Sequence, residues 1–291
     1  MRQCAYLSMD DLSDFEAYDH LTYAPMAELG WQVTEVAWAD TSVDWNDYEV
    51  VVIRSPWDYQ DHAQQFLKVL QQIDASSAVL LNSLQTVEWN ISKSYLKTFA
   101  SKGVPIVPTL WFTSFNLTAM QQAYSDWDTP ELIIKPQISA NADDTFRLPP
   151  ANLAARADQL ASLFSKRDHL VQPFLAAIVE EGEYSLFYFA GEYSHAIVKK
   201  PAQDDFRVQE EHGGQLLEIE PEPELRMAGD KVMEALPEPL LYARVDVVRH
   251  QGEFVLMELE AIEPSLYFNM NAAAARKFAQ AFNTMIDGMG K

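Results

Sequence analysis

The sequence predicts an α/β (α+β) protein: an N-terminal doubly wound parallel sheet followed by segments rich in antiparallel strand pairs. First, strands and helices alternate over residues 1–85, which is typical of a parallel sheet covered by helices on both faces. Second, from residue 183 onward strands follow one another in pairs, with a hairpin signal at Ala190-Gly191. Third, neither GxxxxGK[ST] nor GxGxxG occurs, so the parallel sheet carries no phosphate-binding fingerprint.

The N-terminal elements are expected at strands 4–9, 31–38, 48–55 and 78–82, with helices over 15–29 and 62–73. Gly30 ends the first helix, and the apolar run YEVVVIRS is typical of a buried parallel strand. Ligands of such sheets bind beyond the carboxyl ends of the strands. The candidate substrate residues at those ends are Asp10, Arg54, Ser55, Trp57, Asp58 and Tyr59.

An arginine suits a carboxylate and an aspartate suits an ammonium group, so Arg54 together with an aspartate of this set would fit an amino acid. The alternative is that RSPWDY forms a buried turn around Trp57, with Arg54 paired to a nearby acid. The sequence leaves both interpretations open.

The remaining elements begin with a helix over 92–101, closed by Gly103. The proline-containing stretch 104–112 suits an edge strand. Further strands are expected at 131–136, 169–175, 183–189 and 192–200, with helices over 151–166, 224–235 and 271–286. A second antiparallel pair is expected from 240–248 and 253–262.

In this second pair, alternation of side chains gathers Arg244, Asp246, Glu258 and Glu260 on one face, which we call the acidic face. Asp246 lies opposite Glu258 if the loop has three residues, whereas a two-residue loop requires a bulge. Carboxylates this close repel one another, and a hard divalent cation would relieve the repulsion. A solvated sheet face is the other interpretation.

Two lysines stand at unusual positions. Lys135 ends the apolar strand ELIIKP, where it must line a cleft or bury an uncompensated charge. Lys93 is expected in the first turn of a helix, where the macrodipole disfavours a cation. A bound anion would compensate both, although each has a plain interpretation as an exposed lysine. The loop after Lys135, residues 139–145, contains no glycine.

Composition excludes several classes of protein. A net charge of −22 disfavours nucleic acid as a partner, because phosphate binding needs clustered Lys and Arg. No apolar run reaches the roughly 18 residues that span a bilayer, and the N-terminus turns acidic too early for a signal peptide. The single cysteine, Cys4, excludes an intramolecular disulfide. We therefore expect a cytoplasmic protein without membrane partners.

Several stretches, in this order, resemble the ATP-grasp superfamily: WNISKSYLKTFASKGVPIVPT, LIIKPQISANADDT, LVQPFL, GEYSLFYFAGEYSHAIVKKP, DDFRVQ and YARVDVV…LMELEAIEPS. The resemblance covers residues from about 82 to 275 and is greatest to the glutathione-synthetase-like and RimK-like branch. WNxxK, SPWDY and ELEAIEPS resemble the relatives of the D-cycloserine-forming cyclo-ligase.

The resemblance implies an ATP-grasp architecture, with an N-terminal substrate domain at 1–85 and two subdomains, 86–171 and 172–291, that clamp ATP. It implies that Lys93 and Lys135 contact the phosphates, that Glu183 binds ribose, and that Gln172, Pro173, Phe174 and Leu175 form the adenine hinge. The implied Mg²⁺ ligands are Asp246, Glu258 and Glu260, where relatives often have Asn at the last position. Cations for the transferring phosphoryl group are Arg207, Arg244 and Lys199.

The activity implied by the resemblance is ATP-dependent carbon–nitrogen ligation through an acylphosphate, with release of ADP and phosphate. The expected substrate is an amino acid or a small peptide, and a homodimer is typical of relatives. The alternatives are an intramolecular cyclo-ligase and an ATP-binding module without catalysis.

Overall fold

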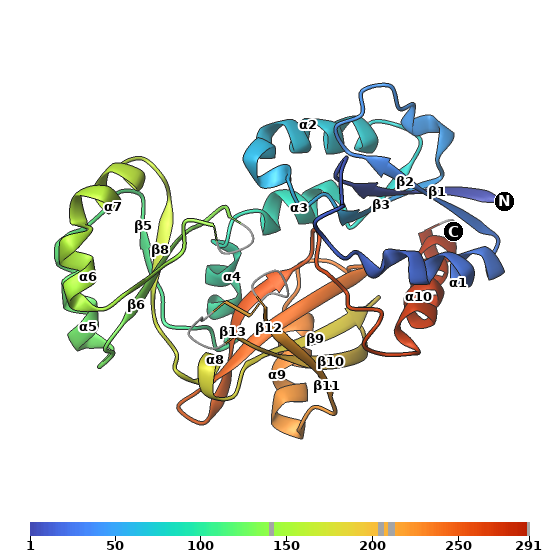
Figure 1. The fold of residues 1–291 in the computed structure, drawn as a ribbon. Helices are drawn as coiled ribbons and strands as arrows, with labels where there is room; N and C mark the ends of the chain where they lie inside the picture. Colours follow the sequence, from blue (N-terminus) through green and yellow to red (C-terminus); the bar gives the residue numbers. More distant parts are fainter. Residues whose placement is uncertain (140–142, 203–206, 209–212, 290–291) are drawn as a thin grey trace.

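A computed structural model describes residues 1–139, 143–202, 207–208 and 213–289. Its N-terminal part is a four-stranded parallel sheet in the order β2-β1-β3-β4 (Figure 1). The strands are β1 (Arg2–Ser8), β2 (Trp31–Ala37), β3 (Val50–Ser55) and β4 (Val79–Leu81). Every residue of β3 is buried, as its apolar sequence predicts. The predicted parallel sheet is confirmed.

Helices cover both faces of this sheet (Figure 1). The helix α2 (Ala63–Asp74) packs with Ala5, Leu7 and Val51 on one face. On the other face lie η1 (Tyr18–Thr22), α1 (Tyr23–Glu28) and the C-terminal helix α10 (Ala274–Met289). The predicted helix over 15–29 is therefore shorter and begins as a 3-10 turn. Two further short turns are η2 (Trp45–Asp47) and η3 (Tyr59–His62).

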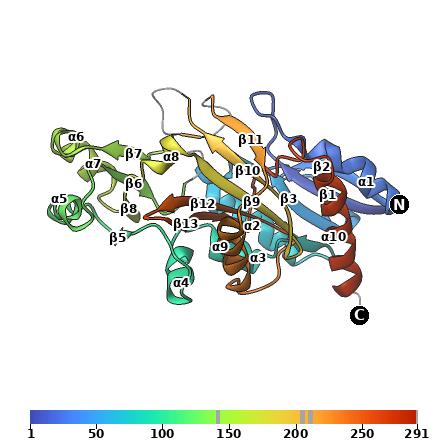
Figure 2. The same ribbon diagram turned by 90° about the horizontal axis from the view of Figure 1, so that it is seen from below.

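The central part is a four-stranded antiparallel sheet in the order β5-β8-β6-β7. Its elements are α3 (Leu84–Asn90), α4 (Tyr95–Ser101), β5 (Leu110–Phe112), α5 (Leu117–Asp126), β6 (Leu132–Pro136), β7 (Phe146–Leu148), α6 (Pro150–Ala155), α7 (Ala157–Leu163) and β8 (His169–Pro173). The strand β5 lies at the sheet edge, but it is shorter than the expected stretch 104–112, and Pro105 and Pro108 lie before it. The single helix expected over 151–166 is instead broken at Arg156. Figure 2 shows α5, α6 and α7 at the outer end of the molecule.

The expected position of Lys93 in a first helical turn is wrong. The helix α4 begins at Tyr95, and Lys93 lies in the short connection after α3. Its backbone N–H donates to the carbonyl of Gln137, 2.8 Å away, next to the end of β6. The tertiary fold, and not a helix dipole, therefore determines where this ammonium group lies.

The C-terminal part is a five-stranded antiparallel sheet in the order β11-β10-β9-β12-β13. Its elements are α8 (Ala177–Glu180), β9 (Glu183–Phe189), β10 (Glu192–Lys200), β11 (Gln215–Ile219), α9 (Pro223–Glu234), β12 (Tyr242–His250) and β13 (Glu253–Glu260). Ala190 and Gly191 both have positive φ, which is the turn expected between β9 and β10. No helix in the described part of the chain is long and apolar enough to cross a membrane.

The register of β12 and β13 decides where the acidic face forms. His250 pairs with Glu253, so the turn has two residues, Gln251 and Gly252, both with positive φ. A bulge between Asp246 and Val247 then restores the pairing of Asp246 with Glu258. Of the two registers that the sequence left open, the structure adopts the two-residue loop with a bulge.

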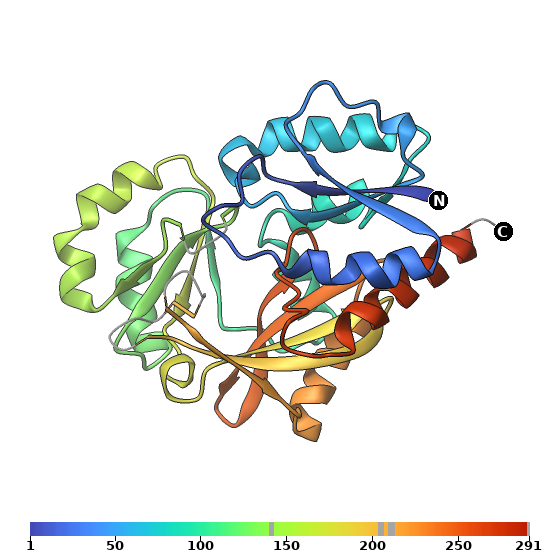
Figure 3. The same ribbon diagram turned by 45° about the vertical axis from the view of Figure 1, so that its right-hand side comes forward.

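The C-terminal helix α10 packs on the N-terminal part of the chain. It lies against α1 (Figure 3), and Phe278 and Phe282 belong to one hydrophobic core with Tyr6 and Trp31 of the N-terminal sheet. The predicted division at 85 and 172 stays a prediction. The helix α10, which ends the predicted segment 172–291, packs on the segment 1–85. The predicted boundary at 172 falls within β8. The three parts meet around one cavity.

Candidate functional site

A cavity of about 440 Å³ lies where the three sheets approach one another. It is lined by every residue that the resemblance implied for nucleotide, metal or phosphoryl binding: Lys93, Lys135, Gln172, Pro173, Phe174, Leu175, Glu183, Lys199, Arg207, Arg244, Asp246, Glu258 and Glu260. Of the substrate candidates, Trp57 and Tyr59 also line it. Segments far apart in the sequence thus converge on one site.

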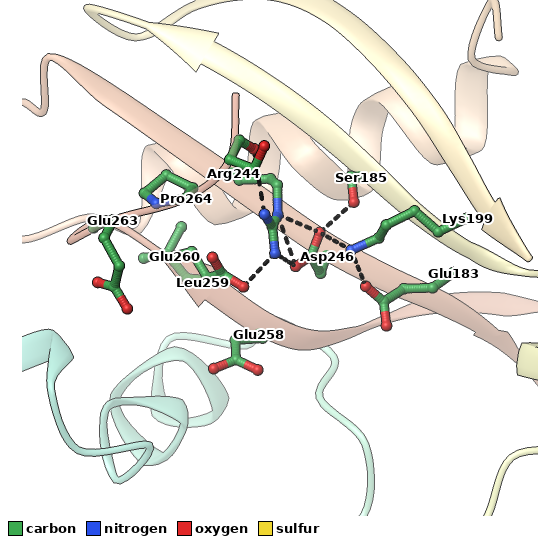
Figure 4. Close-up of polar contacts among 12 residues, drawn as sticks. Glu183, Ser185, Lys199, Arg244, Asp246, Glu258, Leu259, Glu260, Glu263 and Pro264 are labelled. Atoms are coloured by element: carbon green, nitrogen blue, oxygen red, sulfur yellow. Dashed lines mark hydrogen bonds and ion pairs between the residues drawn. The ribbon is translucent and has the colours of Figure 1, made fainter. Parts of the chain in front are cut away.

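The buried centre of the site is Asp246 on β12 (Figure 4). Its carboxylate accepts hydrogen bonds from Arg244 Nε and Nη2, 3.1 and 3.0 Å away, and from the hydroxyl of Ser185. Lys199 Nζ lies 3.5 Å from Asp246 Oδ1 and 2.5 Å from Glu183 Oε1. Lys199 therefore stands between Glu183 and Asp246, and Arg244 binds Asp246 from its other side, toward Glu260.

The pKa values follow from this arrangement. Burial alone would raise the pKa of Asp246, but Arg244 and Lys199 outweigh it and hold the pKa below its usual range. Burial would lower the pKa of Lys199, yet Asp246 and Glu183 raise it. Burial raises the pKa of Glu183 despite the neighbouring Lys199. Lys199 is therefore a fixed cation, not a base.

The cavity side of the acidic face carries Glu258 and Glu260. Lys93 Nζ lies 3.0 Å from Glu258 Oε1 and donates to the carbonyl of Ser139, 2.7 Å away. Arg244 donates to Glu260. Burial raises the pKa of Glu260 to about 7; Arg244 opposes this shift, and Asp246 and Glu258 add to it. A divalent cation would relieve this crowding of carboxylates.

The donor set fits Mg²⁺ only in part. Among the described residues, no three carboxylate or histidine groups are gathered around one point, because Arg244 stands between Asp246 and Glu260. The side chains of Glu258 and Glu260 are each 30% exposed to the cavity, whereas Asp246 is 4% exposed. Mg²⁺ commonly takes one or two carboxylates together with phosphate oxygens. Glu258 and Glu260 fit that pattern, and Asp246 remains a predicted ligand.

Lys135 differs from the other lysines of the cavity. It extends from β6 into the cavity, and no ion pair or hydrogen bond joins its ammonium group to any described residue. Burial lowers its pKa, and Glu258 opposes that shift only in part. A desolvated cation without a carboxylate partner is well suited to an anion from outside the chain.

The predicted hinge lies at the end of β8. Gln172 Nε2 donates to Thr109 Oγ1, 3.0 Å away, and the Phe174 N–H donates to the carbonyl of Glu131. No described group accepts from the Leu175 N–H. Apolar side chains adjoin this strand end and line the cavity: Val107, Ile178, Val208 and Met257. An apolar slot beside a vacant backbone donor suits a planar heterocycle.

Four of the substrate candidates do not line the cavity. Asp10 is exposed, and Ser55 is buried at the end of β3. The Arg54 side chain is buried, with Nε 2.8 Å from Asp19 Oδ1 and its guanidinium over the Tyr242 ring. Asp58 accepts from Trp38 Nε1, 2.7 Å away. These placements match the alternative interpretation of RSPWDY as a buried turn with Arg54 paired to an acid.

Other residues line the substrate side of the cavity without having been proposed from the sequence. Asp14, Phe15 and Glu16 come from the connection after β1. Glu263, Ser265 and Tyr267 come from the segment after β13. Glu263 could have been proposed from the sequence, because the stretch EAIEPS continues directly from the acidic strand. The 139–145 loop and the DDFRVQ segment lie partly outside the described residues, although Ser139, Thr145 and Arg207 line the cavity.

Comparisons with known proteins agree with this architecture. The family model of the D-cycloserine synthetase DcsG N-terminal domain matches residues 4–82. The cycloserine biosynthesis protein DcsG of Streptomyces lavendulae is 28% identical over 250 residues, covering 80% of this chain and 82% of that protein. The crystal structure of D-cycloserine synthetase DcsG has a TM-score of 0.84 at 25% identity, covering 97% of this chain and 99% of that chain.

Two further solved structures share the fold at lower identity. The RimK-domain ATP-grasp protein of Sphaerobacter thermophilus has a TM-score of 0.70 at 12% identity, covering 97% of this chain and 99% of that chain. The ATP-grasp ligase PsnB, solved with a minimal precursor, Mg and ADP, has a TM-score of 0.66 at 16% identity, covering 97% of this chain and 96% of that chain. With the three-sheet fold and its shared cavity, these similarities show that the chain has the ATP-grasp fold and is similar to ligases of that superfamily.

Proposed function

We propose that this chain is an ATP-dependent carboxylate–amine ligase that acts on an amino acid or a small peptide. An acylphosphate would form at the substrate carboxylate, an amine would displace the phosphate, and ADP and phosphate would be released. The observation that carries the proposal is Lys135, a desolvated cation without a partner among the described residues, opposite two cavity-facing carboxylates.

Phosphate binding is supported by the positions of the cations. Lys93 and Lys135 extend into the cavity from the central part, and Arg207 and Arg244 line it from the C-terminal part. Positive charge from two sides suits a polyphosphate, and cations aimed at a transferring phosphoryl group stabilise the charge of its transition state. Lys199 would act through Asp246 by fixing the carboxylate that positions Arg244.

Adenine recognition is supported at the end of β8. The Leu175 N–H points to no acceptor among the described residues, and the neighbouring apolar side chains include Ile178 and Met257. The Phe174 N–H is already bonded to Glu131, so Leu175 is the better candidate for a donor to the base. Glu183 is proposed for the ribose hydroxyls, with its carboxylate held by Lys199.

Magnesium would be held by Glu258 and Glu260, with Asp246 behind them, and would supply charge neutralisation at the phosphates. The residues of the chain would bind and orient the reactants and exclude water from the reaction. No histidine of the described residues lines the cavity, so none of those is proposed as a nucleophile.

An intramolecular cyclo-ligase is the second candidate. The observation in its favour is the match of residues 4–82 to the N-terminal domain of D-cycloserine synthetase. That part of the chain supplies Phe15, Trp57 and Tyr59 to the substrate side of the cavity. In this case a single substrate would provide both the carboxylate and the amine.

The test is a coupled ADP-release assay over amino acids and dipeptides, supplied singly and in pairs. The ligase predicts ADP release that requires a pair, and the cyclo-ligase predicts release with one compound. Glu258→Gln and Lys135→Met are expected to abolish turnover, while the variants stay folded by circular dichroism. Normal turnover in either variant would contradict the site, and Mg-ATP binding without ADP release from any compound would favour a non-catalytic module.

A further inference from the structure

The segment after β13, residues 261–267, is held by side chains on both of its sides. The Tyr242 hydroxyl lies 2.8 Å from the carbonyl of Ile262 and shares its one proton between that oxygen and Ile53 O, 2.5 Å away. The next three backbone carbonyls each accept a hydrogen bond from a side chain of the N-terminal part or of β12. These bonds are Trp57 Nε1 to Glu263 O at 2.9 Å, Arg54 Nη2 to Pro264 O at 3.1 Å and Arg244 Nη1 to Ser265 O at 3.3 Å. We call these donors the clamp.

The clamp gives a structural role to the RSPWDY motif, residues 54–59, which the sequence analysis proposed for substrate contacts. Arg54 is 1% exposed and is itself fixed by Asp19, so it is a rigid donor. Trp57 packs against Phe15, with ring centroids 5.4 Å apart, while its indole N–H bonds the carbonyl of Glu263. A backbone bonded at consecutive residues cannot shift without breaking several buried hydrogen bonds. The clamp therefore fixes the direction in which the Glu263 side chain leaves the backbone.

The carboxylate of Glu263 extends into the cavity, and the Tyr59 hydroxyl donates to it. Among the described residues, no Lys, Arg or His nitrogen lies within 4.0 Å of it. Figure 4 shows it on the far side of Glu260 from the Arg244 and Lys199 network. Burial, with Glu260 as a further cause, raises the pKa of Glu263 to about 8. This carboxyl group faces the cavity without the cation that would compensate its charge.

The surroundings of Glu263 indicate which cation fits. Aromatic side chains that line the cavity lie near it: Tyr59 adjoins its carboxylate, Trp57 bonds its backbone carbonyl, and Phe15 packs on Trp57. Aromatic faces attract an organic ammonium group, and a carboxylate forms a strong charge-assisted hydrogen bond with it. A hard divalent ion would need several further oxygen ligands in place of ring carbons.

We infer that Glu263 binds the protonated amine of the substrate, and that Arg54 and Trp57 are positioning residues that hold Glu263 toward it. The inference rests on the proposed function, because it assigns the amine of the substrate of that same site. The sequence suggested an aspartate for the ammonium group. Asp58 instead accepts from Trp38, whereas Glu263 lines the cavity.

The test compares amino acids with hydroxy acids of the same size. D- and L-alanine and serine are titrated against D- and L-lactate and glycerate, in which a hydroxyl replaces the ammonium group. Dissociation constants are measured by calorimetry with and without Mg-ATP. For at least one amino acid, wild type is expected to prefer the amine by about 10- to 100-fold, the range of a charge-assisted hydrogen bond. Glu263→Gln is expected to lose that preference and to keep the affinity for Mg-ATP within about twofold.

A matched control is Glu238→Gln. Glu238 is also a half-buried carboxylate that accepts from a hydroxyl, with Ser83 Oγ 2.6 Å away, but it does not line the cavity. This variant should keep the full preference for the amine. Trp57→Phe retains an aromatic ring without the N–H and should reduce the ratio of amino-acid affinity to hydroxy-acid affinity. If Trp57 had only a structural role, the substitution would weaken the affinities for amino acids and hydroxy acids equally.

An unchanged ratio in Glu263→Gln would overturn the inference, as would a wild type that binds no amine or binds both series equally. Failure of wild type to bind Mg-ATP would instead refute the proposed function. The amine ratio measured without nucleotide would still report on Glu263 in that case.

Discussion

Lys199 and Lys135 line the same cavity, but only the replacement of Lys199 by methionine is expected to lower the free energy of unfolding strongly. Lys199 is 4% exposed and lies 2.5 Å from Glu183 and 3.5 Å from Asp246. Lys199→Met leaves two buried carboxylates with only Arg244 to compensate them. Lys135 has no carboxylate partner among the described residues, so Lys135→Met removes a desolvated charge and leaves no new one.

The magnitudes follow from these environments. Removing one partner of a buried ion pair costs about 3–5 kcal/mol, a large part of the roughly 5–15 kcal/mol by which a domain is stable. Removing an unpaired desolvated ammonium is expected to change the free energy of unfolding by less than about 1 kcal/mol, or to raise it. The same Lys135→Met change removes a charged contact to phosphate worth about 1.5–3 kcal/mol, or about 10- to 150-fold in affinity for Mg-ATP.

The assay is urea unfolding followed by circular dichroism at pH 7, together with calorimetric titration of Mg-ATP. We expect Lys199→Met to lower the free energy of unfolding strongly. We expect Lys135→Met to preserve it and to weaken nucleotide binding. Equal destabilisation by the two substitutions would refute the reasoning, because it would mean that the ion pairs of Lys199 contribute nothing beyond packing.

Four further substitutions test other parts of the structure. Asn82→Ala removes a buried side chain that donates to the carbonyls of Tyr242 and Ala261, so thermal unfolding should show a loss of about 2–4 kcal/mol. Gly229→Ala places a Cβ against the Tyr188 hydroxyl and should lower stability by about 1–3 kcal/mol, whereas Gly288→Ala, with open space around it, should raise stability by up to about 1 kcal/mol. Glu263 has a folded-state pKa of about 8 against an ordinary value of 4.5, so the unfolded state loses this proton first and wild-type stability falls as pH rises between those values. Glu263→Gln removes that slope, and its stability relative to wild type should be greater at pH 8 than at pH 5 in urea unfolding.

The residues of the acidic face could be predicted from the sequence, but their pairing could not. Alternation along two strands was enough to place Arg244, Asp246, Glu258 and Glu260 together, because the period of a strand is fixed by covalent geometry. The register needed the turn and the bulge, which the sequence offered only as alternatives. How the charges are paired could not be predicted, since Arg244 was free to face either carboxylate or the solvent.

The substrate side was harder to predict, for a physical reason. Arg54 and Asp58 follow a parallel strand as ligand-binding residues do, yet their partners, Asp19 and Trp38, come from other connections of the sheet. Whether a polar side chain faces a cavity or a buried partner depends on contacts between segments distant in sequence.

The sequence by itself therefore determined the parallel N-terminal sheet, the antiparallel pairs and the residue types of the site, because these depend on local periodicity and on the order of motifs. Only the tertiary structure decided that Lys135 is unpaired among the described residues while Lys199 is paired, and that Glu263 faces the cavity. Charge compensation and burial are properties of the space between the three parts, and the side chains that fill that space come from all of them.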